Sequence, residues 1–193
     1  MVCPATSPIL QPALGSTTSI DTSDDRLFKA AIHKNKLTGS STLWTAHNIQ
    51  VNTNCVGSAS GGRNGARWYE VRGSVPTTGA PLGGTMVLVQ SGTRCDPAVT
   101  NPQGYIFPSV AETGQGHMGL GSSYASALLF AGASAAGRLR TDASGTTQAA
   151  TTIQPGLSSY TVTGSGTRNR WGDYSHTQVD PTDDQTLWTF QEY

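Results

Sequence analysis

Short runs of alternating apolar and polar residues recur along the chain, separated by segments rich in glycine, asparagine and proline. Alternation with a period of two places successive side chains on opposite faces of a β-strand, while glycine and proline mark the turns between strands. Before residue 91 the pattern predicts one four-stranded antiparallel meander, with strands at 26–33, 42–47, 66–71 and 85–90.

A second meander is predicted to begin at Tyr105. The apolar, alanine-rich stretch 125–131 continues this meander, or forms a short helix instead. Small polar residues predict a loop over 132–150. The other expected strands of the second meander are 106–111, 117–122 and 159–163.

The last segment predicts a third hairpin, 174–179 with 186–190. Leu43-Trp44-Thr45 recurs here as Leu187-Trp188-Thr189, each time on the second strand of a hairpin. Regularly spaced, similar hairpins indicate a repeat architecture, and four strands per unit fit the blades of a β-propeller. The predicted fold is therefore all-β, a propeller-like array of four-stranded antiparallel meanders that is incomplete as a single chain.

Composition supports an all-β domain. The chain has 193 residues, which suits one domain, and only 12% of them are charged, against about 25% in ordinary globular domains. Its 23 glycines and abundant serine and threonine indicate many turns and neutral, polar outer faces. We expect an extended lead-in over 1–25, where proline, serine and threonine gather, and one propeller-like domain over 26–193.

The distribution of charge and of apolar residues argues against some classes of binding partner. The formal net charge is zero and the basic residues are dispersed, which argues against nucleic acid as a partner. No apolar run approaches the roughly 18 residues of a membrane-spanning helix. The first residues lack the basic and apolar regions of a signal peptide, so any secretion signal is expected upstream of this chain.

Three cysteines are present, Cys3, Cys55 and Cys95, and their odd number leaves at least one without an intrachain partner. Cys55 and Cys95 lie in loops that a disulfide could join; three reduced thiols are the alternative. No zinc-binding cysteine pattern occurs, and we expect no cofactor. Three aspartates in one turn could hold calcium, or could simply form the turn: Asp180, Asp183 and Asp184.

Several motifs resemble secreted bacterial sialidase-like (BNR/Asp-box-type) β-propellers, in particular the C-terminal part of these proteins. The closing run Arg168-Asn169-Arg170-Trp171-Gly172-Asp173-Tyr174-Ser175 carries most of the resemblance. Further similar motifs are Asp24-Asp25-Arg26, Leu43-Trp44-Thr45-Ala46-His47, Ala66-Arg67-Trp68-Tyr69, Phe107-Pro108-Ser109-Val110-Ala111, Val179-Asp180-Pro181 and Glu192-Tyr193. The resemblance implies a propeller and an extracellular or periplasmic setting, but no defined reaction.

The chain departs from true sialidases. Their Asp-box, Ser-x-Asp-x-Gly-x-Thr-Trp, has only a shortened counterpart over 182–188. Sialidase-type chemistry needs arginines that clamp a carboxylate and a tyrosine activated by a carboxylate. Two compact clusters supply these residue types, Arg67, Tyr69 and Glu70, and Arg170, Asp173 and Tyr174. The alternative is that these residues join loops and fill the core.

Three functions remain open. The leading one is an extracellular module that binds a glycan or another surface partner without catalysis, on exposed aromatic rings. A sialidase-like glycoside hydrolase is the alternative, and a structural piece that forms homo-oligomers through open sheet edges is the third. The expected ligand-binding residues are Trp44, His47, Trp68 and Trp171.

Overall fold

The computed structural model describes residues 8–73, 85–163 and 168–193. Within these ranges every regular element is a strand, and no helix occurs that could cross a membrane. The strands are β1 (Ile20–Asp21), β2 (Lys29–Lys34), β3 (Ser41–Val51), β4 (Arg63–Gly73), β5 (Met86–Arg94), β6 (Gly104–Glu112), β7 (Met118–Ser126), β8 (Leu129–Arg138), β9 (Thr151–Gln154), β10 (Asn169–Arg170), β11 (His176–Val179) and β12 (Leu187–Phe190).

The first four-stranded sheet is the predicted meander, in the order β2-β3-β4-β5. Its two central strands are longer than expected, eleven residues each. Four of the added residues are polar yet buried, Asn48, Gln50, Arg63 and Asn64, and hydrogen bonds compensate their burial. Asn48, for example, donates to the Thr22 carbonyl and accepts from the Phe107 N–H. Because these residues are polar, the alternating pattern of the sequence did not predict that the strands extend through them.

The second sheet is also an antiparallel meander, β6-β7-β8-β9. The alanine-rich stretch 125–131 continues this meander as expected, but the loop expected over 132–150 and the strand expected over 159–163 are partly or wholly wrong. The alanine-rich stretch forms no helix: β7 and β8 meet in a tight turn there. The first residues of the predicted loop 132–150 belong to β8, and the fourth strand is β9, not 159–163. Small residues are needed here, since a Cβ on Gly132 would come within 2.7 Å of the Gln154 carbonyl oxygen.

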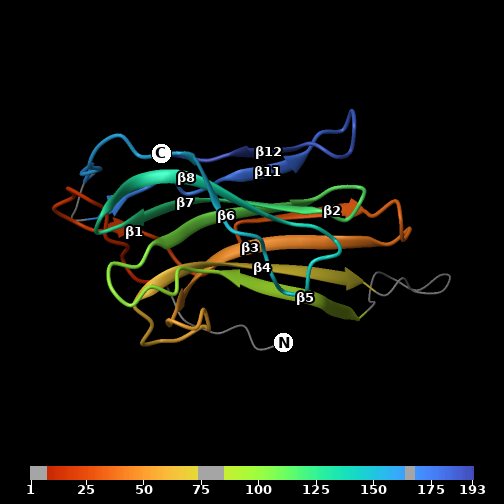
Figure 1. Cartoon of the computed structure of the whole chain (residues 1–193), viewed down its shortest axis with the longest axis horizontal. Coiled ribbons are helices and arrows are strands. Elements are labelled where there is room, and N and C mark those ends of the chain that lie inside the picture. Colours follow the sequence, from red (N-terminus) through yellow and green to blue (C-terminus); the bar gives the residue numbers. More distant parts are fainter. Residues whose placement is uncertain (1–7, 74–84, 164–167) are drawn as a thin grey trace.

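The first two sheets pack face to face and enclose the main core. Trp44 and Trp68 stack with ring centroids 5.7 Å apart and are almost fully buried. They contact Val110 of β6 and Leu120 of β7 in the same cluster. Figure 1 shows β3 and β4 beside β6 and β7, with the β11–β12 hairpin on the far side of the second sheet.

The predicted third hairpin, β11–β12, covers the other face of the second sheet. Its approach requires glycine: a Cβ on Gly119 would lie 2.8 Å from the Leu187 side chain. A Cβ on Gly121 would lie 2.1 Å from Thr189 Oγ1. The molecule is thus a stack of three antiparallel sheets, of which the last has two strands.

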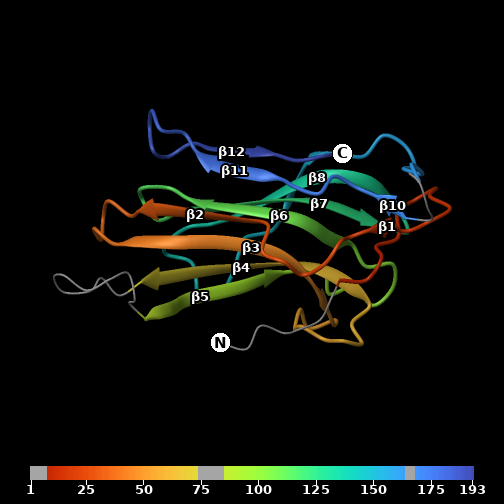
Figure 2. The same ribbon diagram turned by 180° about the vertical axis from the view of Figure 1, so that it is seen from behind.

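The lead-in segment joins the fold through β1, which pairs in parallel with β10. Ile20 is fully buried and packs in a second cluster with Trp171 and Phe107. Figure 2 shows β1 and β10 together at one end of the strands. Ile20 of β1 also forms an antiparallel bridge with Gln11. In the described part of the chain β1 pairs with neither β11 nor β12, so it adds no strand to that hairpin.

The first strands of the three sheets, β2, β6 and β11, lie together along one edge of the stack. The Ser109 hydroxyl of β6 lies 2.8 Å from the Thr177 hydroxyl of β11. Lys29 of β2 donates to the Thr177 carbonyl over 2.6 Å. Partial burial here lowers the pKa of the Lys29 ammonium. This common edge leads directly to the cavity lined by residues before β2 and around β10.

Cys55 and Cys95 form a disulfide, which is one of the two alternatives left by the sequence. The bond ties the loop after β3 to the residue that follows β5. Cys95 is buried against Ile49 and Val51, so the bond also closes the far end of the first sheet. Cys3 lies outside the described residues.

Candidate functional site

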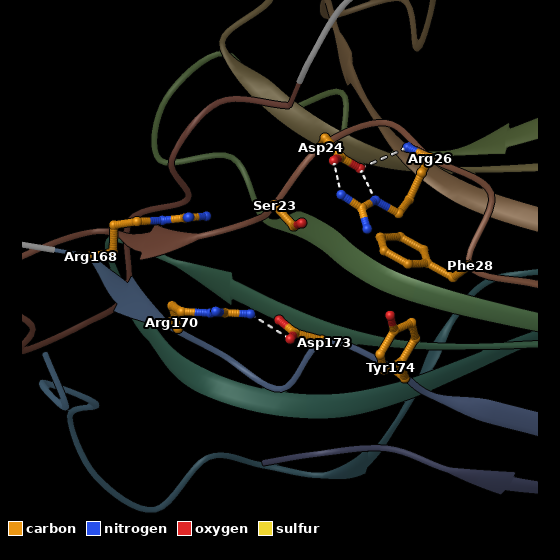
Figure 3. A pocket seen from close by; sticks show the side chains of 8 residues that line it. All are labelled: Ser23, Asp24, Arg26, Phe28, Arg168, Arg170, Asp173 and Tyr174. Carbon is orange, nitrogen blue, oxygen red and sulfur yellow. Dashed lines mark hydrogen bonds and ion pairs between the residues drawn. The ribbon is translucent and has the colours of Figure 1, made fainter. Parts of the chain in front are cut away.

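A cavity of about 380 Å³ opens where β2 and β11 begin. Figure 3 shows side chains from two distant parts of the sequence pointing into it. One group precedes β2 and the other spans β10 and the start of β11. The lining residues are Ser23, Asp24, Arg26, Phe28, Arg168, Arg170, Asp173 and Tyr174.

The aromatic side of the cavity is fixed by the core. Phe28 packs against the buried Phe107 ring, with centroids 5.5 Å apart. Tyr174 meets Phe28 edge-on at 6.5 Å and remains largely exposed. Phe28 thus fixes the aromatic side of the cavity to the core, while the ring edge and hydroxyl of Tyr174 are accessible to a ligand in the cavity.

Each guanidinium of the cavity is held by an aspartate. Arg26 donates from Nε to Asp24 over 2.6 Å and makes a second contact through Nη2. Arg168 pairs with Asp21, which stands on β1 beside the cavity, and these bonds hold the Asp21 pKa below its usual value. The Arg26 guanidinium similarly lowers the pKa of Asp24.

The third guanidinium, that of Arg170, pairs with Asp173 three residues later. All three arginine side chains remain more than half exposed. An arginine has five N–H donors and a carboxylate has two acceptor oxygens, so each pair keeps donors and acceptors for a ligand. The positive charges are matched by the aspartates, and the cavity therefore presents a balanced array rather than a cationic one.

Five residues are the candidates for catalysis: Arg67, Glu70, Arg170, Asp173 and Tyr174. The structure brings the last three together in this cavity. The other two lie elsewhere. Arg67 stands on the outer face of β4, where it donates to Ser91 and Thr93 and covers the Tyr69 ring at 5.2 Å.

Glu70 points to the opposite face of β4 and accepts a 2.6 Å hydrogen bond from Gln90. It lines a smaller cavity of about 240 Å³ together with Glu112 and Arg72. Burial raises the pKa of Glu112, although hydrogen bonds from Trp44 and Thr42 act in the opposite direction. The proposed catalytic residues are therefore split between separate parts of the molecule.

The expected aromatic binding platform is not exposed. Trp44 and Trp68 are 1% and 0% accessible, and Trp171 packs against Tyr160 in the second core cluster. These rings have no face open to a ligand because they fill the space between the sheets. His47 is equally buried, and its Nε2 lies 3.0 Å from the Tyr69 hydroxyl.

The aspartate turn between β11 and β12 is held by its own hydrogen bonds. Asp183 accepts from Thr186 N–H and hydroxyl groups, and Asp180 accepts from the Trp188 indole over 3.0 Å. Asp184 lies 2.7 Å from both His33 and Lys36. Within the described ranges no three metal-ligating side chains gather. Calcium at this turn stays a prediction.

Sequence reasoning missed Arg26, Arg168 and Phe28 as site residues. Both arginines lie in motifs that pointed to propellers, so their types were visible. The sequence did not show that the two arginines lie in one cavity, because the parallel pairing of β1 with β10 joins segments almost 150 residues apart. Two-residue strands leave no periodic signal in a sequence.

The closing motif and the shorter motifs thus supply a cavity rich in paired charges, next to the common edge of three sheets. Comparison with protein-family models, with curated protein sequences and with solved structures finds no match to this chain.

Proposed function

We propose that this protein is an extracellular, propeller-like module that binds a neutral glycan in the arginine–aspartate cavity without catalysis. The single observation that carries the proposal is the wall of exposed Arg–Asp pairs beside the Tyr174 and Phe28 rings. Such a wall offers both donors and acceptors to a ligand rich in hydroxyl groups.

The propeller-like arrangement is supported by the order of the strands. Each sheet begins with its strand on the common edge, β2, β6 or β11, and then proceeds outward. Blades of a propeller have four strands and surround a central channel. The cavity lies at the end of this edge, where the inner strands begin, so a ligand there would contact several sheets at once.

Charge balance favours a neutral ligand over an acidic one. A bare guanidinium cluster would attract a carboxylate, since bidentate Arg–carboxylate pairs are strong. Here Asp21, Asp24 and Asp173 already occupy those positions. A carboxylated sugar would have to displace an internal aspartate, whereas sugar hydroxyls can use the donors and acceptors that remain.

A sialidase-like glycoside hydrolase is the second candidate, and one observation favours it: Tyr174 shares a cavity with three arginines. Retaining sialidases use a tyrosine nucleophile. The hydrolase requires the arginines to release their aspartates and clamp the substrate carboxylate. Hydrolysis of a sialoside would therefore identify it.

The Cys55–Cys95 disulfide supports the extracellular part of the proposal, because disulfides persist mainly in oxidising compartments. The low content of charged residues and the neutral strand faces fit the same setting.

The test is a fluorescence-labelled protein applied to an array of neutral and acidic oligosaccharides, followed by calorimetry with the best binder. We expect binding to neutral sugars. Tyr174→Ala should weaken it about tenfold, and Asp173→Asn with Arg170→Gln should abolish it. Arg140→Gln, outside the cavity, is the matched control and should bind normally.

The two candidates give different results. Binding restricted to carboxylated sugars, with release of 4-methylumbelliferone from its sialoside, would replace the first proposal by the second. Absence of binding to every sugar, or neutral-sugar binding that survives the double variant, would refute the placement of the site.

A further inference from the structure

The contact between the first two sheets provides an internal template. Trp44 projects from the face of the first sheet that meets the second sheet, and it lies in one buried cluster with Val110 and Leu120. These two residues are cross-strand neighbours on β6 and β7. Close to them, Glu112 accepts the Trp44 indole N–H over 2.8 Å. A tryptophan thus packs onto an apolar pair with a charged group beside it.

The third sheet carries a corresponding tryptophan, and in the described part of the chain no further sheet packs on it. Leu187 faces the second sheet, so the next residue, Trp188, points away from it. Trp188 is 51% exposed and Phe190, on the same side of β12, is 61% exposed. We call Trp188 and Phe190 the outer hairpin face. The Leu-Trp-Thr tripeptide makes Trp188 the counterpart of Trp44.

The face of the first sheet that is turned away from the second sheet, here called its front, carries an apolar surface that no segment of the described residues covers. Paired residues put one apolar side chain from each strand into a single row: Ile32, Leu43, Val71 and Leu88. Ile32 is 72% and Leu88 38% exposed. We call these four residues the front row. Counted from the hairpin turn, Ile32 and Leu43 correspond to Val110 and Leu120 of the second sheet.

We propose that a second copy of this chain joins these two surfaces, with the outer hairpin face of one copy packed on the front row of the other. The inference goes beyond glycan binding and does not depend on it. Trp188 then meets Ile32 and Leu43 as Trp44 meets Val110 and Leu120 within one chain.

Charge complementarity supports this alignment of the outer hairpin face on the front row. Lys34, two residues after Ile32 on the exposed face of β2, occupies the position of Glu112 in the template. Trp188 already donates to Asp180. A second copy therefore brings the positive Lys34 to the negative Asp180, where the template has the Trp44–Glu112 hydrogen bond.

The contact joins different surfaces and is therefore heterologous, so it either closes into a ring or grows into a filament. Each chain contributes three stacked antiparallel sheets, apart from the short parallel pair β1–β10. Two copies provide six, which lies within the four to eight blades of natural propellers, whereas three copies provide nine. The expected assembly is a two-fold symmetric dimer in which the same contact between outer hairpin face and front row occurs twice.

The test is multi-angle light scattering after size exclusion, over a range of concentrations. Wild type should have about twice the 20.1 kDa mass of one chain. Trp188→Glu and Ile32→Glu should each raise the dimer dissociation constant at least about a hundredfold. Val99→Glu, at an exposed site away from both surfaces, is the control and should leave the dimer intact.

Mixing the two variants gives the decisive result. The Trp188→Glu variant keeps the wild-type front row, and the Ile32→Glu variant keeps the wild-type outer hairpin face. An equimolar mixture should therefore form heterodimers, in which these two unmodified surfaces make one of the two contacts. A symmetric contact between like surfaces would show no such recovery. Circular dichroism of each variant verifies that a monomer is folded.

A monomeric wild type at millimolar concentration would overturn the proposal, as would a dimer that both variants leave unchanged. Filaments abolished by both variants would overturn the closed dimer. If dimerisation fails while sugar binding is intact, only the present inference is refuted, and the reverse result refutes only the proposed glycan site.

Discussion

The Trp44 indole of the first sheet donates a 2.8 Å hydrogen bond to the Glu112 carboxylate of the second sheet. The Thr42 hydroxyl donates to the same oxygen over 3.0 Å. This contact connects the two sheets at the border of their shared apolar core. It also places a carboxyl group where burial penalises its charged form, so stability should depend on pH through this residue.

Glu112→Gln should remove that pH dependence. Burial puts the folded-state pKa of Glu112 above its ordinary value of 4.5. The protonated carboxyl therefore favours folding: the contribution is complete below pH 4.5 and is lost as pH rises through the folded-state pKa. Each unit of pKa difference is worth about 1.4 kcal/mol. Relative to wild type, the variant should gain stability from pH 4 to pH 7.

Urea unfolding followed by tryptophan fluorescence at pH 4, 5.5 and 7 measures this difference in the free energy of unfolding. The pH 4 comparison is an internal control, because both side chains are then neutral. A difference that stays constant over the whole range would contradict the assigned direction of the Glu112 pKa.

Trp44→Ala should destabilise the protein by about 3–5 kcal/mol, because it leaves a large cavity between two sheets. Trp44→Phe keeps much of the volume but removes the indole donor of Glu112. Its expected cost is about 1–3 kcal/mol. Thermal and urea unfolding provide the measurement.

The control for this pair is Val99→Ala, at an exposed position, with an expected change of about 0.5 kcal/mol or less. If Trp44→Phe proved as mild as the control, the hydrogen bond between the sheets would have no energetic importance.

Loss of the disulfide should lower the free energy of unfolding by about 4 kcal/mol. The bond spans a sequence separation of 40 residues, and the chain-entropy relation for a loop of that length yields this magnitude. Thermal unfolding with and without dithiothreitol measures the effect. The double variant Cys55→Ser, Cys95→Ser should match the reduced protein and should not respond to dithiothreitol.

Gly121→Ala should loosen the β11–β12 hairpin, since the new Cβ would lie 2.1 Å from Thr189 Oγ1 and 2.3 Å from Gln191 Nε2. Overpacking of this kind costs about 1–3 kcal/mol. Faster proteolysis of the C-terminal hairpin, read by mass spectrometry, is the expected sign. Gly62→Ala, with no atom within 4 Å of its Cβ, should behave like wild type.

The strand pattern of the central elements was visible in the sequence. The runs around Trp44, Trp68, Val87 and Val110 alternate or carry β-branched and aromatic residues, and all became strands in the expected order. Alternation succeeds because one face of each strand is buried and the register admits no slip.

Small-residue segments gave the wrong predictions. The stretch 132–150 was expected to be a loop, yet its first seven residues, 132–138, belong to β8. Its glycines and alanines allow neighbouring backbones to approach closely but contribute little hydrophobic surface. The alternation of apolar and polar residues is therefore weak in this strand. Trp44, Trp68 and Trp171 were expected to bind a ligand but are buried. Aromatic residues occur both in cores and on binding surfaces, so the residue type alone does not distinguish the two.

By itself the sequence determined the all-β class, the two meanders, the final hairpin and the types of residue in the cavity, because these follow from short-range periodicity and composition. Only the tertiary structure decided that Arg26 and Arg170 share one cavity, and that Trp44 is buried while Trp188 is exposed. Those outcomes depend on sheet stacking and on pairing between distant segments such as β1 and β10. No local pattern encodes such contacts, since they are fixed by packing over the whole chain.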